Sequence, residues 1–190
     1  IEIKTGIEID YLEGKEDILR KEISKHNFDY VIGSVHIVDG WVIDDEKNIH
    51  RYDEYNPMDL YMKYFDALQN LVTSRLFDVV AHFDVIKKFN YDPYENYDFL
   101  IEDTLEAMKK HDLCLEINTS GIDKPIKETY PGSKMFKRLV ELNIPIVFGS
   151  DAHSPNEVAR YFEITTKFLK KSGCSHIVSF TRRKRKSIKI

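Results

Sequence analysis

The stretch Pro145-Ile146-Val147-Phe148-Gly149-Ser150-Asp151-Ala152-His153 sets the pattern on which the fold prediction depends. Its first half is a short apolar run rich in β-branched and aromatic residues, which is typical of a buried strand. Two side chains that can bind a metal ion, Asp151 and His153, follow directly after that run. The same order, an apolar strand followed by a histidine or a carboxylate, recurs along the chain and predicts an α/β fold.

On both sides of this stretch, predicted strands alternate with predicted helices over the rest of the sequence. Short apolar runs predict six strands, at residues 1–9, 30–36, 77–82, 113–118, 145–149 and 175–181. Apolar residues spaced by three and four predict five helices, at 14–25, from Pro57 past Leu71, through 99–111, through 135–140 and at about 156–171. Residues 37–56 are polar and are interpreted as a loop. Strands that alternate with helices predict a parallel sheet covered by helices.

The residues at the carboxyl ends of the strands favour a barrel over an open sheet. No glycine-rich phosphate loop follows the first strand, so nothing in the sequence favours an open nucleotide-binding sheet. In a parallel barrel all strands end on one face, where residues distant in sequence converge. The side chains at these ends are Glu8, His36, His82, Glu116 with Asn118, Asp151 and His153.

These side chains have the chemistry of a metal site. Imidazoles and carboxylates together suit divalent Zn, Mn or Fe, and one carboxylate can bridge two ions. Taken singly, a histidine at a strand end is more often a satisfied polar residue than a ligand, and Glu8 could cap the following helix. The repetition on five consecutive strands favours a multinuclear metal site. The remaining histidines lack this setting and are interpreted as structural: His26, His50, His111 and His176.

Composition limits the classes of protein that remain. The length of 190 residues is that of one domain, with 28 basic and 32 acidic residues and a net charge of −4. Six of the basic residues lie in 181–190, so the rest of the chain is acidic and a nucleic-acid partner is disfavoured. No apolar run is long enough for a membrane helix and no leader pattern opens the chain, so a cytoplasmic location is expected. The two cysteines, Cys114 and Cys174, predict no disulfide framework.

Five motifs in order resemble those of the polymerase and histidinol phosphatase (PHP) family. They are Gly6-Ile7-Glu8-Ile9-Asp10, Gly33-Ser34-Val35-His36, Ala81-His82-Phe83-Asp84, Leu115-Glu116-Ile117-Asn118-Thr119 and Gly149-Ser150-Asp151-Ala152-His153. The resemblance covers nearly the whole chain. Two further runs, Asp39-Gly40-Trp41 after His36 and Tyr130-Pro131 after Gly121, are most similar to the histidinol-phosphatase branch.

The resemblance implies a distorted (β/α)7 TIM-like barrel of the PHP type with up to three divalent metals at its carboxyl face. Glu8 would bridge two ions, and His36 and His82 would complete the shell of the second. Asp151 would bind the first ion and His153 the third.

One feature of the family is missing from this sequence. Family members begin with a His-x-His strand before the Gly-x-Glu strand, whereas this chain begins at Ile1. We therefore expect residues 1–190 to form a single PHP-type domain without its first one or two strand and helix units. In that case the first and third metals would bind more weakly.

The implied activity is that of a phosphoric monoester hydrolase, with histidinol phosphate, an intermediate of histidine biosynthesis, as the substrate. Asp151 or His153 would protonate the leaving alkoxide. Arg160, expected at the start of the last helix, is a candidate phosphate clamp because a guanidinium grips two phosphate oxygens. In the loop after His36, Trp41 and nearby carboxylates such as Asp44 are candidates for binding the cationic amino alcohol.

Other interpretations of the same residues remain open. Arg160 and the acidic loop are also consistent with solvated surface positions. A phosphoesterase acting on nucleotides or nucleic-acid ends would use the basic tail, and a non-catalytic PHP-like module would use none of the chemistry. A metal-dependent amidohydrolase with a similar barrel would cleave C–N bonds and leave phosphate esters intact.

Overall fold

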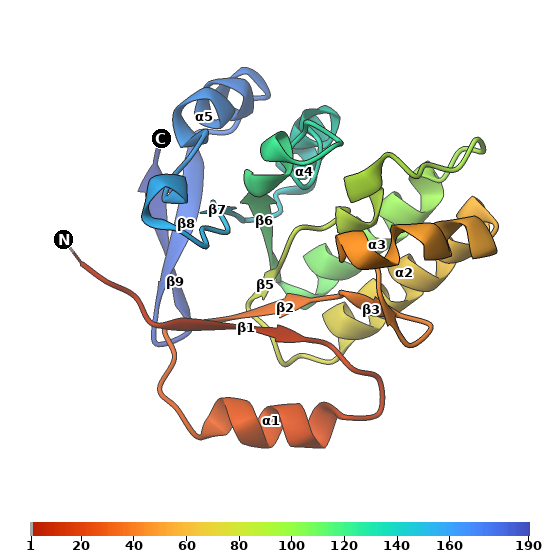
Figure 1. Cartoon of the computed structure of the whole chain (residues 1–190). Helices are drawn as coiled ribbons and strands as arrows, with labels where there is room; N and C mark the ends of the chain where they lie inside the picture. The colour runs from red at the N-terminus through yellow and green to blue at the C-terminus, as the bar shows by residue number, and fades with distance from the viewer. Residues whose placement is uncertain (1) are drawn as a thin grey trace.

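Five parallel strands form the central sheet of the computed structural model, which describes residues 2–190. They are β1 (Gly6–Asp10), β2 (Tyr30–Ser34), β5 (Val79–Val80), β6 (Cys114–Asn118) and β7 (Ile146–Gly149). Their order is β1-β2-β5-β6-β7, and every pairing is parallel, as the sequence predicts. Within residues 2–190 the sheet stays open, with β1 and β7 at its edges (Figure 1).

One α-helix follows each strand of this sheet, which confirms the predicted alternation. The helices are α1 (Glu16–Ser24), α2 (Pro57–Thr73), α3 (Asp98–His111), α4 (Phe136–Leu142) and α5 (Phe162–Lys171). The start of α2 is set by Asn56, whose side chain accepts hydrogen bonds from the backbone N–H groups of Met58 and Asp59. Pro57 stands at the first helical position, where its missing N–H costs nothing. Within residues 2–190 no helix is both long and apolar enough to cross a lipid bilayer.

The core lies between the sheet and the pair of neighbouring helices α2 and α3. Leu60, Tyr64 and Leu68 of α2 are fully buried, as are Leu105 and Met108 of α3. Each aliphatic side chain buried in this way contributes roughly 1.5–3 kcal/mol of hydrophobic stabilisation. This packing fixes the strands whose carboxyl ends carry the candidate site.

Residues 37–56, interpreted from the sequence as a loop, contain regular structure. Two short strands, β3 (Ile37–Val38) and β4 (Trp41–Val42), form a hairpin, and the 3₁₀ helix η1 (Glu46–Glu54) follows. The hairpin turns at Asp39 and Gly40, both of which have positive φ angles. An Asp-Gly pair favours that turn. From the sequence the segment is nevertheless interpreted as a loop because its composition is polar.

The last helix begins six residues later than predicted. The 3₁₀ helix η5 (Pro155–Glu157) comes first, and Ala159 and Tyr161 have φ angles of 58° and 61°. An α-helix cannot continue through such left-handed residues, so α5 begins only at Phe162. Arg160 therefore lies before the helix rather than in its first turn, which corrects the predicted position.

The basic end of the chain is a strand. The predicted terminal strand is present as β8 (His176–Thr181), and it pairs antiparallel with β9 (Lys184–Lys189) in a separate two-stranded sheet. In Figure 1 this hairpin stands beside β7, with the exposed β9 on its outer side. Shorter 3₁₀ turns complete the structure: η2 (Val85–Phe89), η3 (Ser120–Asp123) and η4 (Ser133–Met135).

Candidate functional site

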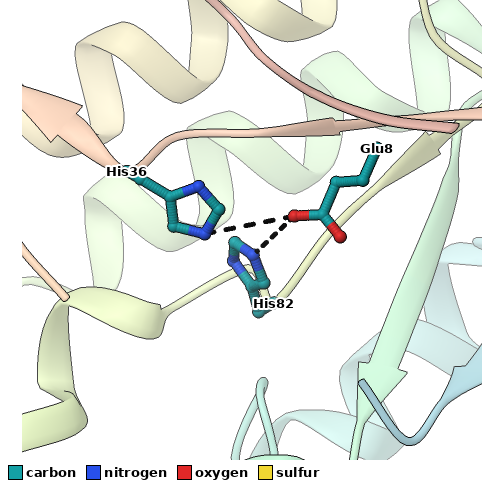
Figure 2. A group of neighbouring side chains, drawn as sticks. All are labelled: Glu8, His36 and His82. Carbon is teal, nitrogen blue, oxygen red and sulfur yellow. Dashed lines mark hydrogen bonds and ion pairs between the residues drawn. The ribbon is translucent and has the colours of Figure 1, made fainter. Parts of the chain in front are cut away.

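Three predicted metal ligands meet at the carboxyl end of the sheet. Glu8 lies on β1, His36 follows β2 and His82 follows β5, and these three strands are neighbours. One ligand atom from each residue lies within 4.8 Å of the other two (Figure 2). Oε1 of Glu8 is 3.2 Å from Nε2 of His82 and 4.0 Å from Nε2 of His36. The structure thus brings Glu8, His36 and His82 together as the strand-end pattern predicts.

Asp10 orients the imidazole of His36. Oδ1 of Asp10 is 2.7 Å from Nδ1 of His36 and also accepts the backbone N–H of His36. A carboxylate at Nδ1 keeps the proton on that nitrogen and leaves the Nε2 lone pair free. The donor set of one carboxylate oxygen and two imidazole nitrogens, oriented in this way, fits a divalent ion such as zinc.

The charges around His82 favour a bound cation. Burial alone would lower the pKa of His82, but its hydrogen bond to Glu8 and the charges of Glu8, Glu116 and Asp151 raise that pKa to about 9. Burial likewise opposes ionisation of Glu8, but the hydrogen bond from His82 and the charges of His82 and His36 hold the pKa of Glu8 below its usual range. The negative potential that raises the pKa of His82 also attracts a metal ion.

Glu116 supports this group without joining it. Its buried carboxylate accepts hydrogen bonds from the backbone N–H of His82 at 3.0 Å and from Nδ2 of Asn118 at 3.2 Å. Burial raises the pKa of Glu116, and the charge of His82 opposes that effect. The carboxylate sits against Gly149 of β7, where any Cβ atom would overlap Oε1 of Glu116. Glycine at this position therefore leaves the space that Glu116 occupies.

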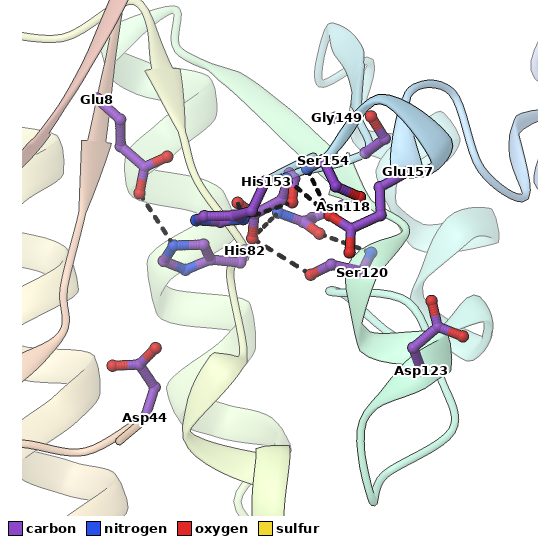
Figure 3. Close-up of polar contacts among 12 residues, drawn as sticks. Glu8, Asp44, His82, Asn118, Ser120, Asp123, Gly149, His153, Ser154 and Glu157 are labelled. Atoms are coloured by element: carbon purple, nitrogen blue, oxygen red, sulfur yellow. Dashed lines mark hydrogen bonds and ion pairs between the residues drawn. The ribbon is translucent and has the colours of Figure 1, made fainter. Parts of the chain in front are cut away.

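Asp151 and His153 lie apart from the three-residue group. Oδ2 of Asp151 is 3.4 Å from Nδ2 of Asn118 and 3.3 Å from Oγ of Ser120, two residues that Figure 3 shows near His153. The ring of His153 is 84% exposed, and its Nδ1 lies 3.0 Å from the backbone carbonyl of Asp151. Their predicted roles as metal ligands and proton donors stay predictions.

A cavity of about 310 Å³ joins these elements. Four of the five predicted metal ligands line it, and so does Arg160. The other lining residues are Asp44, Val85, Lys88, Ser120, Lys124 and Tyr130. The cavity therefore combines metal-ligand chemistry with three cationic side chains.

Three buried polar atoms of residues that line this cavity have no partner among residues 2–190. They are Nδ1 of His82, Nε of Arg160 and the hydroxyl of Tyr130. The Nη1 atom of Arg160 is held 3.0 Å from Asp123 and 3.6 Å from Glu157. Buried polar groups are nearly always hydrogen-bonded, so these atoms are satisfied by water or by a ligand that enters the cavity.

Trp41 lies outside the cavity. It is 3% exposed and packs edge-on against Tyr52 and at a tilt against Tyr55, with the guanidinium of Arg51 over its ring. It belongs to the hydrophobic core, so its position gives no support to the predicted contact with substrate. That role stays a prediction.

Sequence reasoning missed Asp10, Lys88 and Tyr130. Asp10 could have been found, because residues two apart on a strand face the same side and Glu8 is such a neighbour. Tyr130 reaches the cavity because its backbone pairs with Asn118, a long-range contact that no local pattern reveals.

Two histidinol-phosphatases are similar to this chain in sequence. A probable histidinol-phosphatase of Deinococcus radiodurans is 34% identical over 185 residues, covering 97% of this chain and 70% of that protein. The histidinol-phosphatase of Bacillus subtilis is 27% identical, covering 86% of this chain and 68% of that protein.

A solved structure supports the fold. The crystal structure of histidinol phosphate phosphatase from Lactococcus lactis, complexed with zinc, L-histidinol and phosphate, superposes with a TM-score of 0.78 at 21% identity. The match covers 98% of this chain and 72% of that chain.

The model of the PHP domain family matches residues 1–120, a span that contains Glu8, His36, His82 and Glu116. Both the sequence match and the meeting of these strand-end residues agree with the motif resemblance, and the chain belongs to the PHP domain family.

Proposed function

We propose that this protein hydrolyses a phosphate monoester and that its substrate is histidinol phosphate, which gives histidinol and phosphate in histidine biosynthesis. The observation that carries the proposal is the meeting of Glu8, His36 and His82 beside a cavity lined by Lys88, Lys124 and Arg160. Metal ligands next to cationic side chains suit a phosphate group. The histidinol-phosphatase relatives support the choice of substrate.

Glu8, His36 and His82 would hold one divalent ion, with Asp10 fixing the ring of His36. Such an ion, when bound, polarises phosphoryl oxygens and lowers the pKa of water. Asp151 and His153 are the candidate further ligands at the rim of the same cavity.

Arg160 would bind the phosphate through its unpaired Nε–H, with Asp123 and Glu157 holding the guanidinium in place. Hydrolysis breaks the P–O bond to histidinol and forms one to the oxygen of water, so one proton must reach the leaving alkoxide. Asp151 or His153, which both line the cavity, would deliver that proton. Asp44, which lines the same cavity and pairs with Lys88 at 3.5 Å, offers a carboxylate for the cationic amino group of the substrate.

In this proposal residues 1–190 form one domain and the protein is cytoplasmic, which fits its two free cysteines. A small phosphate ester is the expected partner, and nucleic acid is not. The basic residues of β9 lie outside the cavity, so no observation at the site favours the alternative of nucleic-acid ends.

Phosphate release from histidinol phosphate, an aryl phosphate and a nucleoside monophosphate tests the proposal, with Zn, Mn or Fe supplied. Histidinol phosphate should be the best substrate, and Arg160→Ala should raise KM for all three by about tenfold or more, because it removes a charge-assisted contact to phosphate. The matched control Lys137→Ala removes one charge on the exposed face of α4 and should change neither constant. No release from any ester by the metal-loaded protein would overturn the proposal, and a preference for the nucleotide would favour the other branch.

A further inference from the structure

We propose a second binding site, for an anion that carries a chain of phosphate groups. It lies at the opposite end of the parallel strands from the metal ligands. The site is a cavity of about 560 Å³, called here the distal cavity, whose cationic lining residues are Arg75, Lys110, Arg183 and Arg185. It lies at the amino ends of β5 and β6, because its residues Asp78 and Leu113 directly precede those strands. The metal ligands lie at the carboxyl ends, so the two cavities are separate.

The distal cavity has an excess of positive charge in a chain whose net charge is −4. Against its four cationic residues stand two carboxylates, Asp78 and Asp112. Arg183 pairs with Asp78 at 2.8 Å, and Arg185 pairs with Asp112. Arg75 and Lys110 make no ion pair or side-chain hydrogen bond within residues 2–190. Two cationic groups therefore stay available for an anion.

The backbone at two of these arginines favours other residues. Arg75 follows the end of α2 with a φ of 58°, and the turn between β8 and β9 places Arg182 at 49° and Arg183 at 61°. Glycine or asparagine is preferred in this left-handed region, both after a helix and in a two-residue hairpin turn. Arginine at these positions carries backbone strain, and strain of this kind is concentrated at functional sites. The strain at Arg75 and Arg183, the two of these residues that line the cavity, therefore agrees with a binding role for their guanidinium groups.

The arginine of the hairpin is held in place before any ligand arrives. Nε of Arg183 donates to Asp78, and Nη2 donates to the backbone carbonyl of Leu76 at 2.7 Å. Its backbone N–H donates to the carbonyl of Asp29 at 2.8 Å. Asp78 is itself fixed by the backbone N–H of Val31 at 2.9 Å. A guanidinium fixed in this way loses little entropy when it binds an anion.

The shape of the surface favours several phosphates over one. A cavity of about 260 Å³ shares Arg75 and Arg183 with the distal cavity and adds Arg20. The two cavities thus adjoin the same two arginines and are together called here the basic trough. The dipole of α3 accounts for Lys110 in its last turn, but it does not account for arginines supplied by the β8–β9 hairpin.

Calorimetric titration of the 190-residue protein with tripolyphosphate in about 0.1 M salt tests this site, because unspecific charge effects are largely screened there. Wild-type protein should bind, and Arg75→Gly should bind about tenfold more weakly, as expected for one lost charge-assisted contact. The melting temperature of Arg75→Gly without ligand should equal or exceed that of the wild type, because glycine accepts the φ of this position. ATP should bind like tripolyphosphate, and adenosine should not bind.

Two matched variants distinguish binding in the distal cavity from unspecific attraction and from binding beside the metal ligands. Lys137→Ala removes a charge far from the trough and should bind like the wild type, and Arg160→Ala should retain distal binding. The proposal is overturned if tripolyphosphate at about 1 mM gives no heat, a concentration at which weak sites fill. It is also overturned if Lys137→Ala weakens binding as much as Arg75→Gly, or if only Arg160→Ala loses it.

Discussion

Nδ1 of His36 lies 2.7 Å from Oδ1 of Asp10, while Nε2 of the same ring faces Oε1 of Glu8 at 4.0 Å. The two ring nitrogens thus have different partners, one a carboxylate that fixes the proton and the other a potential ligand shared with His82. This arrangement makes Asp10 a positioning residue for a metal site that it does not itself join. Substitution of Asp10 should therefore change the metal affinity of the site.

Asp10→Asn should weaken the affinity for Zn or Mn by about 10–100-fold, because a neutral amide oxygen accepts the Nδ1 proton of His36 more weakly than the carboxylate does. Competition with a chromogenic chelator measures this affinity. Asp103→Asn, an equivalent change at an exposed position of α3, should leave it unchanged. Equal affinity in Asp10→Asn and wild type would contradict the positioning role.

Gly149→Ala should destabilise the protein by about 1–3 kcal/mol, because the new methyl group overlaps the carboxylate of Glu116. Urea unfolding measures the free energy. Combining the change with Glu116→Ala removes the overlap, so the double variant should be more stable than the sum of the single losses predicts. Strict additivity of the two losses would show that the methyl group finds space elsewhere.

The sequence alone predicted the alternation of strands and helices and the meeting of Glu8, His36 and His82. This was possible because parallel topology brings the carboxyl ends of strands together, independently of the conformation of the loops. The prediction failed at residues 156–161, where the sequence predicts the start of the last helix but positive φ angles at Ala159 and Tyr161 interrupt it. Composition alone does not reveal backbone angles of this kind.

Long-range packing is the second feature of the structure that the sequence did not predict. The sequence places Trp41 after His36 but does not say that Tyr52 and Tyr55 enclose it. The cavity position of Tyr130 depends in the same way on its pairing with Asn118, which brings together two segments separated by a turn and a loop.

Trp41→Phe separates packing from substrate recognition. The loss of core contacts should lower the free energy of unfolding by about 1–3 kcal/mol. The ratio of kcat/KM for histidinol phosphate to that for an aryl phosphate should stay the same, because the ring does not line the cavity. A fall in this ratio without a loss of stability would restore the predicted substrate contact.

The two cysteines should differ in reactivity. Burial raises the pKa of the Cys114 thiol to about 12, opposed by the charge of Arg185, so very little thiolate forms at neutral pH. Cys174 is partly exposed. A thiol reagent near pH 8 should label one cysteine quickly and the second only after unfolding. Rapid labelling of both thiols in the folded protein would contradict the buried position of Cys114.

The most direct test of the central claim is the metal content per chain, measured by elemental analysis of protein purified without chelator, for wild type and for His82→Gln. A site built from Glu8, His36 and His82 predicts about one tightly held Zn, Mn or Fe ion in the wild type and its loss in the variant. Lys137→Ala should keep the wild-type content. Equal metal content in wild type and His82→Gln, or none in either, would contradict the assignment of this group as the metal site.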